Sequence, residues 1–249
     1  MIILWLCAAG FGAAFVDSIA GGGGLISLPA LLVAGVPPHL ALGTNKFAST
    51  AASFTSSLGY ARSAKVHWPL LKYLIPMTLL GAAAGVHSVL RIDQRLVQVM
   101  VLVLILLVGA YTLFMKALGT EDRFAGVNRR NLWPGMILAA GLGFYDGFFG
   151  PGTGSFLIFG LILIYGFDFL NAGGNARVLN FISNVTALVL FVSFGKVDYS
   201  AGIPMALAMI AGARFGTKLA LHQGVKLVKP IFVTMSLAVA GKMLWGLWR

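Results

Sequence analysis

The chain has 249 residues, of which 59% are hydrophobic and only 10% charged, and its mean hydropathy is +0.91. A soluble domain carries about 25% charged residues, so this composition excludes an ordinary water-soluble protein and indicates an all-α polytopic membrane protein. The net charge of +11 does not indicate nucleic-acid binding. The basic residues are instead spread through short loops, as the positive-inside rule describes for membrane proteins.

The first apolar segment, about residues 2–36, is interrupted by four consecutive glycines, and Asp17 lies one helical turn before them. A break of this kind leaves backbone N–H and C=O groups that lipid cannot satisfy, so protein or a water-filled cavity must surround it. Residues 1–16 lack the basic start of a signal peptide and are interpreted as a membrane helix. Because one crossing takes about 20 residues, we expect a re-entrant hairpin or two short helices.

Three uninterrupted spans follow, at roughly 41–61, 69–90 and 96–115. Lys46 lies near the start of the first, directly after Asn45. A cation deep in a membrane helix costs at least about 2.5–3.5 kcal/mol on insertion scales, so it usually faces a cavity or a partner. The other interpretation is a long side chain that snorkels to the interface.

The second half of the chain repeats this plan, with a broken segment at about 132–166 and spans at 172–194, 199–221 and 227–248. We therefore expect a first transmembrane repeat at 1–118, a cytoplasmic linker at 119–131 and a second repeat at 132–249, with about eight spans in total.

The repeats match residue by residue around the two breaks. Asp146 follows Asp17 at a spacing of 129 residues, and Arg177 follows Lys46 at a spacing of 131. Broken helices at corresponding places in two halves are the best sequence indication of a transporter's substrate site. The second break contains Pro151 where the first has glycine, so it is expected to be stiffer.

The relative orientation of the repeats depends on the broken segments. The repeats are parallel if each broken segment crosses the membrane once, and inverted if it returns to its starting side. The distribution of basic residues barely separates these topologies, and we favour inverted repeats.

The glycine breaks predict an anion site. Glycine lets a ligand approach the backbone closely, and the helix that resumes at Leu25 or Ser155 presents free N–H groups and the positive end of its dipole. Close helix packing through small residues is the alternative. The predicted substrate-binding residues are Gly21, Gly22, Gly23, Gly24, Asn45, Lys46, Gly150, Gly152, Thr153, Gly154, Asn175, Arg177 and Asn180.

Asp17 and Asp146 are predicted proton-coupling residues or ion-pair partners of the two cations, and helix caps are the alternative. Other polar side chains on the same spans can contact a solute or a neighbouring helix, Ser49, Ser183 and Asn184 among them. No metal, cofactor or catalytic residue is predicted, since the histidines lack metal-ligand spacing and Gly150–Ser155 lacks the lysine of a P-loop.

Two stretches resemble the sulfite exporter TauE/SafE family, and in particular its YfcA-like branch. They are Phe15–Gly24 with Gly43–Phe47 in the first repeat, and Ala176–Asn184 with Gly195–Asp198 in the second. The resemblance covers nearly the whole chain. It implies a multi-pass transporter of the bacterial cytoplasmic membrane for sulfite, sulfonates, sulfoacetate or related small anions.

The sequence thus favours a secondary transporter of small anions, driven by a proton or solute gradient. The expected partners are a small-molecule anion and the lipid bilayer, not nucleic acid, and a homo-oligomer is left open. A passive anion channel shares the same features, and a membrane-embedded enzyme is the third class of protein considered.

Overall fold

The computed structural model describes residues 1–114, 119 and 121–223, and within these residues every regular element is an α-helix. The predicted all-α class is therefore confirmed. Of the described helices, α1, α4 and α8 are long and apolar enough to cross a membrane by length and composition. The predicted span at 227–248 lies outside the described residues. The helices are α1 Ile2–Ala20, α2 Gly24–Val33, α3 Pro38–Arg62, α4 Trp68–Leu90, α5 Gln94–Phe114, α6 Arg129–Phe148, α7 Thr153–Tyr165, α8 Phe169–Ser193 and α9 Tyr199–Gln223.

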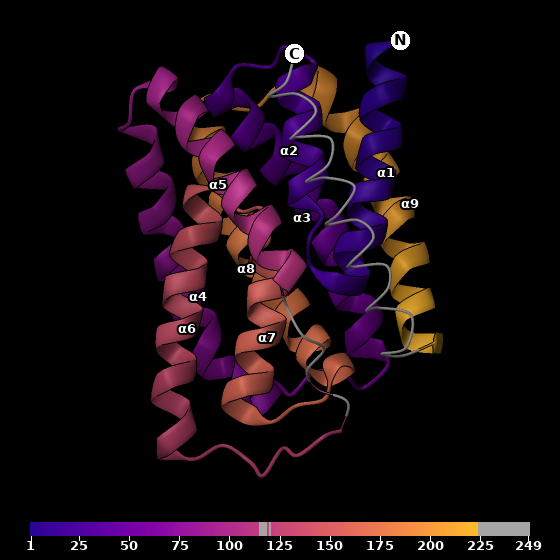
Figure 1. Cartoon of the computed structure of the whole chain (residues 1–249), viewed down its shortest axis with the longest axis vertical. Helices are drawn as coiled ribbons and strands as arrows, with labels where there is room; N and C mark the ends of the chain where they lie inside the picture. Colours follow the sequence, from indigo (N-terminus) through magenta and orange to yellow (C-terminus); the bar gives the residue numbers. More distant parts are fainter. Residues whose placement is uncertain (115–118, 120, 224–249) are drawn as a thin grey trace.

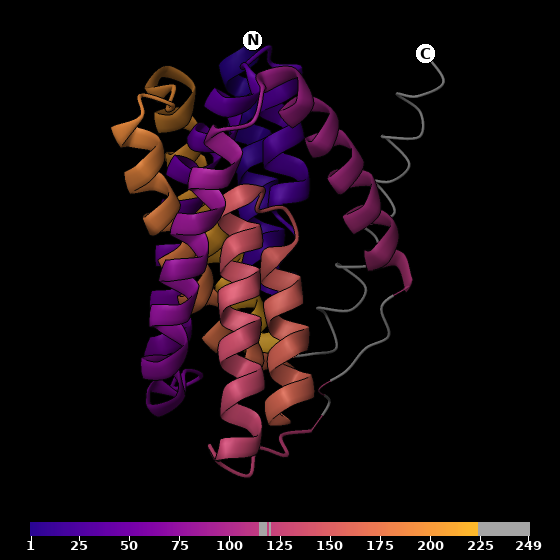
Figure 2. The same cartoon turned by 90° about the vertical axis from the view of Figure 1, so that its left-hand side faces the viewer.

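Each broken segment is a pair of helices that contact each other, α1 with α2 and α6 with α7. Figure 1 and Figure 2 show that α1 begins at the end of the molecule that holds the N-terminus, whereas α6 begins at the opposite end. The helices resume at Gly24 and Thr153, slightly earlier than predicted, because Gly23 and Gly152 are already the N-caps. The two breaks consequently lie in the interior, between the two ends.

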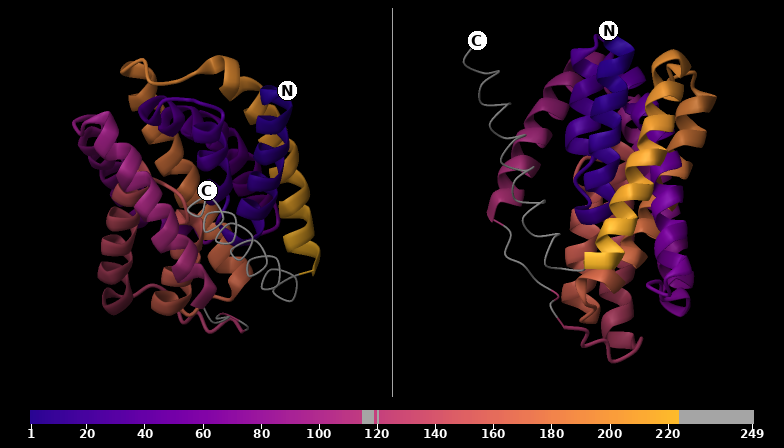
Figure 3. Two further views of the ribbon diagram at one scale, coloured as in Figure 1. Left: turned by 45° about the horizontal axis from the view of Figure 1, so that its top comes forward. Right: turned by 90° about the vertical axis from the view of Figure 1, so that its right-hand side faces the viewer.

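The long helices α3 and α8 pack against each other, α1 packs along α9, and α6 packs along α4 (Figure 3). In the two outer pairs, α1 with α9 and α4 with α6, glycines let the helices come close, as is usual for membrane helices. A Cβ atom at Gly81 or Gly85 of α4 would collide with backbone of α6, and one at Gly212 or Gly216 of α9 would collide with backbone of α1. These contacts hold α6 close against α4 and α1 close against α9.

Candidate functional site

The two helix breaks touch each other. Gly21 and Gly150 both have left-handed backbone, with φ of 91° and 102°, a conformation that favours glycine. The Ser155 N–H donates to the Gly21 carbonyl at 3.2 Å, and the Ser155 hydroxyl donates to the Ala20 carbonyl at 3.0 Å. A Cβ at Gly24 would lie 2.8 Å from Pro151 Cα. The breaks therefore form a single centre built from both halves of the chain.

Two ion pairs cross this centre, each joining a cation of one half to an acid of the other. Lys46 Nζ lies 2.9 Å from Asp146 Oδ1, and Arg177 Nη1 lies 3.0 Å from Asp17 Oδ2. The Lys46 side chain is 2% exposed and the Arg177 side chain 0%. Such burial is incompatible with snorkelling to the interface, and each cation instead has the charged partner that a buried charge requires.

The acids have further hydrogen bonds. Asp17 Oδ1 accepts the Gly23 N–H at 3.0 Å, so Asp17 both caps the break and pairs with Arg177. Asp146 Oδ2 accepts the Ser183 hydroxyl. Lys46 Nζ also donates to Asn184 Oδ1 at 3.1 Å. The capping and ion-pair interpretations of Asp17 are therefore compatible.

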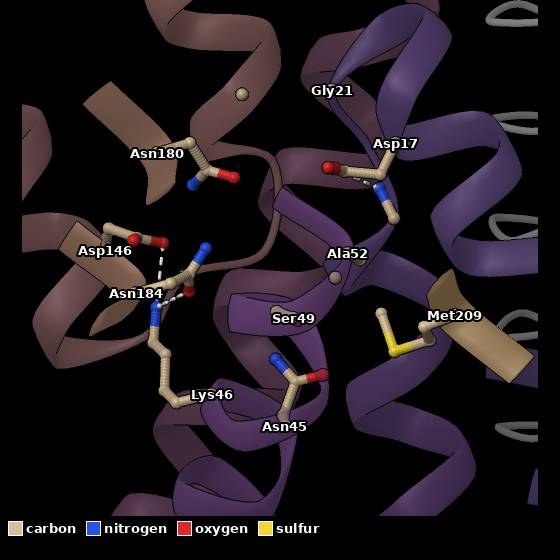
Figure 4. A pocket seen from close by; sticks show the side chains of 14 residues that line it. Asp17, Gly21, Asn45, Lys46, Ser49, Ala52, Asp146, Asn180, Asn184 and Met209 are labelled. Atoms are coloured by element: carbon tan, nitrogen blue, oxygen red, sulfur yellow. Dashed lines mark hydrogen bonds and ion pairs between the residues drawn. The ribbon is translucent and has the colours of Figure 1, made fainter. Parts of the chain in front are cut away.

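A small cavity of about 20 Å³ lies at this centre (Figure 4), with Asp146, Asn180 and Asn184 on one side and Asp17 on the other. This volume is enough for about one water molecule, so a larger solute requires the surrounding elements to move apart. The lining residues are Asp17, Gly21, Gly23, Gly24, Asn45, Lys46, Ser49, Ala52, Asp146, Gly150, Gly154, Asn180, Asn184 and Met209.

Most of the residues predicted from the sequence therefore meet at one cavity, but five do not line it. Asn175 instead binds the connection between α3 and α4, since its Oδ1 accepts the His67 N–H at 2.9 Å. Its Nδ2 donates to the Asn171 carbonyl at 2.7 Å. The Thr153 hydroxyl donates to the Gly150 carbonyl. The other predicted residues outside the lining are Gly22, Gly152 and Arg177.

Four lining residues belonged neither to the predicted substrate-binding set nor to the predicted proton-coupling pair, Asp17 and Asp146. Asn184 and Ser49 had a signal, because they are polar residues on otherwise apolar spans. Met209 and Ala52 had none, since an apolar side chain in a membrane helix has no pattern that separates a cavity wall from a packing surface.

Several hydrogen-bonding groups at this centre lack a partner within the part of the protein that the structure describes. Within the described residues, Arg177 Nε and Nη2 and Asn45 Oδ1 have no hydrogen-bond partner. The N–H groups of Gly24 and Gly154 lie in the first turns of α2 and α7, where a helix has no acceptor of its own for its N–H groups. Donors thus outnumber acceptors among these groups, and unfilled buried donors suit a ligand that carries oxygen acceptors.

Comparison with known proteins identifies the family of this chain. The chain matches the family Sulfite exporter TauE/SafE over residues 6–243. It is 39% identical to a probable membrane transporter protein of Haemophilus influenzae, with 96% of this chain and 93% of the relative covered. It is 37% identical to the probable membrane transporter protein YfcA of Escherichia coli, with 94% and 86% covered. No solved structure gives a significant match.

Proposed function

Because the chain belongs to the TauE/SafE sulfite exporter family, we propose that this membrane transporter is a secondary transporter of small anions. Sulfur-containing anions, such as sulfite, sulfonates or sulfoacetate, are the expected substrates, and a proton or solute gradient supplies the energy. The relatives carry the names of membrane transporters, and the protein is a multi-pass protein of the bacterial cytoplasmic membrane.

The pair of crossed ion pairs is the observation that supports an anion as the solute. Lys46 and Arg177 are buried at the meeting point of two helix N-termini, where backbone donors and helix dipoles also favour negative charge. In the state described, Asp146 and Asp17 neutralise these cations. A solute anion would take over one of these cations when its carboxylate partner is released or protonated.

We also propose that the two halves are inverted repeats. Gly43 and Gly174 occupy equivalent positions, and each lies against the backbone of a loop in the other half, at Lys196 and Lys65 respectively. The outer helices behave in the same way, since α1 packs on α9 as α6 packs on α4. Inverted repeats with broken helices at the midplane are the architecture of several secondary transporter folds, in which the repeats rock around a fixed site.

The small volume of the cavity favours a gated transporter over an open anion channel. A cavity of about 20 Å³ has no room for a sulfur oxyanion, so substrate entry requires a conformational change. Flux against an opposing gradient in proteoliposomes separates the two functions, because a channel only dissipates the gradient.

The experiment that tests the proposed function is a thermal-shift screen of the detergent-solubilised protein against sulfite, sulfoacetate, alkanesulfonates, sulfate and carboxylates. A ligand at 100 times its Kd stabilises the folded state by about 2.7 kcal/mol. We expect a shift with sulfur-containing anions that is lost in Lys46→Gln/Asp146→Asn, which replaces the ion pair by two amides. A shift with cations or neutral solutes alone would refute the anion site.

A further inference from the structure

The two acids of the site differ in the partners of their second oxygen. Asp146 Oδ1 faces Lys46, and Asp146 Oδ2 accepts a hydrogen bond from the Ser183 hydroxyl. Asp17 Oδ2 faces Arg177, and Asp17 Oδ1 accepts a hydrogen bond from the Gly23 N–H. A hydroxyl can either donate or accept, whereas a backbone N–H can only donate. The acids are therefore not equivalent as places for a proton.

Ser183 has an alternative acceptor within reach. Its Oγ lies 3.0 Å from the Asn180 carbonyl oxygen, as well as in hydrogen-bond contact with Asp146 Oδ2. If Asp146 takes up a proton, its O–H can donate to Ser183 Oγ while the Ser183 hydroxyl turns to the Asn180 carbonyl. The Asp146 carboxyl, the Ser183 hydroxyl and the Asn180 carbonyl then each keep a hydrogen-bond partner.

Among the described residues, no hydrogen bond gives Asp17 a comparable acceptor for a carboxyl proton. Its contacts are the Gly23 N–H and the guanidinium of Arg177, which are donors only and, in the case of arginine, permanently charged. At the position equivalent to Ser183, the first half carries Ala52, which has no hydroxyl. Both the sequence and the hydrogen bonds therefore distinguish Asp146 from Asp17.

The elements packed against α6 bring no second acid to Asp146 within the described residues. From α3 it faces Lys46, and from α8 it faces Ser183 and Asn184. Tyr145, its neighbour on α6, donates its hydroxyl to the Pro151 carbonyl. The titratable side chains of the other packed helices are Tyr165 on α7 and the exposed Lys72, Tyr73 and His87 on α4.

From these contacts we propose that Asp146 is the proton-binding residue of the site, that Ser183 is its positioning residue, and that each monoanion binds together with one proton. This proposal rests on the proposed anion transport. Protonation of Asp146 frees Lys46, whose side chain lines the cavity and can then bind the anion. The proton comes from the same aqueous phase as the anion and leaves with it.

Charge balance sets the stoichiometry. The two ion pairs make the centre neutral, with two cations and two carboxylates. An added monoanion without a proton would leave one net negative charge buried in the protein, which is costly in a low-dielectric interior. One proton for each monoanion keeps the loaded centre neutral, so the transport step moves no net charge.

The test is titration calorimetry of the purified protein with methanesulfonate, a monoanion that does not itself titrate in the working range. Repeating the titration near pH 8 in buffers of different ionisation enthalpy gives the number of protons taken up. We expect about one proton for each bound anion, and therefore a Kd that rises about tenfold for each unit of pH in that range. In Asp146→Asn we expect binding with no proton uptake and no such pH dependence.

Variants at Ser183 and Asp17 make the assignment specific. Ser183→Ala removes the hydroxyl that donates to the ionised Asp146 carboxylate, so it should move the pH dependence of the Kd to higher pH. Ser183→Thr, which keeps the hydroxyl, should restore it. Asp17→Asn should retain proton uptake, and Asp17→Asn/Arg177→Gln serves if the single variant does not fold. Anion binding without proton uptake in the wild-type protein, or uptake abolished by Asp17→Asn and kept by Asp146→Asn, overturns the proposal. No methanesulfonate binding in any variant overturns the proposed function and this inference with it.

Discussion

At the scale of single residues, the site depends on charges that neutralise one another. Lys46 and Asp146 are both 2% exposed in their side chains, so neither can turn to water for compensation. Removing one partner of a buried pair is far more costly than removing both, because the remaining charge stays buried and unpaired.

This asymmetry predicts the effect of substitutions in the Lys46–Asp146 pair. We expect Lys46→Met to lower the free energy of unfolding by about 3–5 kcal/mol, since it leaves Asp146 without its cation. Lys46→Met/Asp146→Asn should recover most of that loss. Thermal unfolding in detergent, analysed as a double-mutant cycle, measures the coupling. Equal losses in the single and double variants would mean that the two residues do not interact.

At the scale of elements, the close contacts of the outer helices depend on glycine. A Cβ at Gly81 of α4 would collide with the Ala140 carbonyl of α6, whereas a Cβ at Gly141 of α6 has no atom within 4 Å. The two positions thus form a matched pair, one inside the interface and one outside it.

We expect Gly81→Ala to destabilise the protein by about 1–3 kcal/mol, because the added methyl overpacks the interface between α4 and α6. Gly141→Ala should be neutral or stabilising by roughly 0.5–1 kcal/mol, as for other exposed helical glycines. Unfolding midpoints of the two variants in the same detergent are the measurement. A similar loss in both variants, or no loss in Gly81→Ala, would refute the overpacking of this interface.

The start of α9 provides a pH-dependent element outside the spans. Hydrogen bonds from the Ser200 hydroxyl and from the Ala201 and Ser200 N–H groups hold the pKa of Asp198 below its usual value. The folded pKa is lower than the unfolded one, so this stabilisation is present above the unfolded pKa and is lost as the pH falls through the folded pKa.

We therefore expect Asp198→Ala to cost about 1 kcal/mol near neutral pH, which is typical for loss of an N-cap, and less in acid. Asp198→Asn should keep most of the cap at all pH values. Unfolding midpoints measured from pH 7 down to pH 3 compare the three proteins. A cost for Asp198→Ala that does not decrease in acid would contradict the ionised cap.

At the scale of the whole molecule, the positions of two helix connections bear on the proposed orientation of the repeats. Figure 2 shows the connection between α3 and α4 at one end of the molecule and the connection between α8 and α9 at the other. In the proposed repeats these two connections are equivalent, so parallel repeats would place them on the same side of the membrane and inverted repeats on opposite sides.

Cysteine labelling tests this arrangement. Ser63 and Ser193 are exposed and adjoin these two connections, and the natural Cys7 is replaced by serine in the background. We expect an impermeant maleimide to label Ser193→Cys in intact cells and Ser63→Cys only after the membrane is opened. The reason is that the α3–α4 connection lies at the same end as the start of α6, which follows the predicted cytoplasmic linker (Figure 2). Labelling of both from one side would refute inverted repeats.

The sequence alone determined the helical class, the two breaks and the identity of the buried charges. These properties are local: hydropathy over about 20 residues defines a possible span, and a glycine run interrupts it wherever the chain folds. Asp17, Lys46 and Asp146 could be selected in this way because a charge in an apolar span is costly unless it faces a cavity or a partner.

Only the tertiary structure decided which groups meet. The sequence left open whether Lys46 pairs with the acid of its own half or of the other, and the structure joins it to Asp146, 100 residues away. Asn175 was expected at the site but pairs with the His67 backbone instead, while Met209 forms part of the cavity wall without any sequence signal. The physical reason is that packing between helices far apart in the sequence decides which side chains meet. A helix surface of small residues can pack against many other helices, so its sequence does not specify its neighbour.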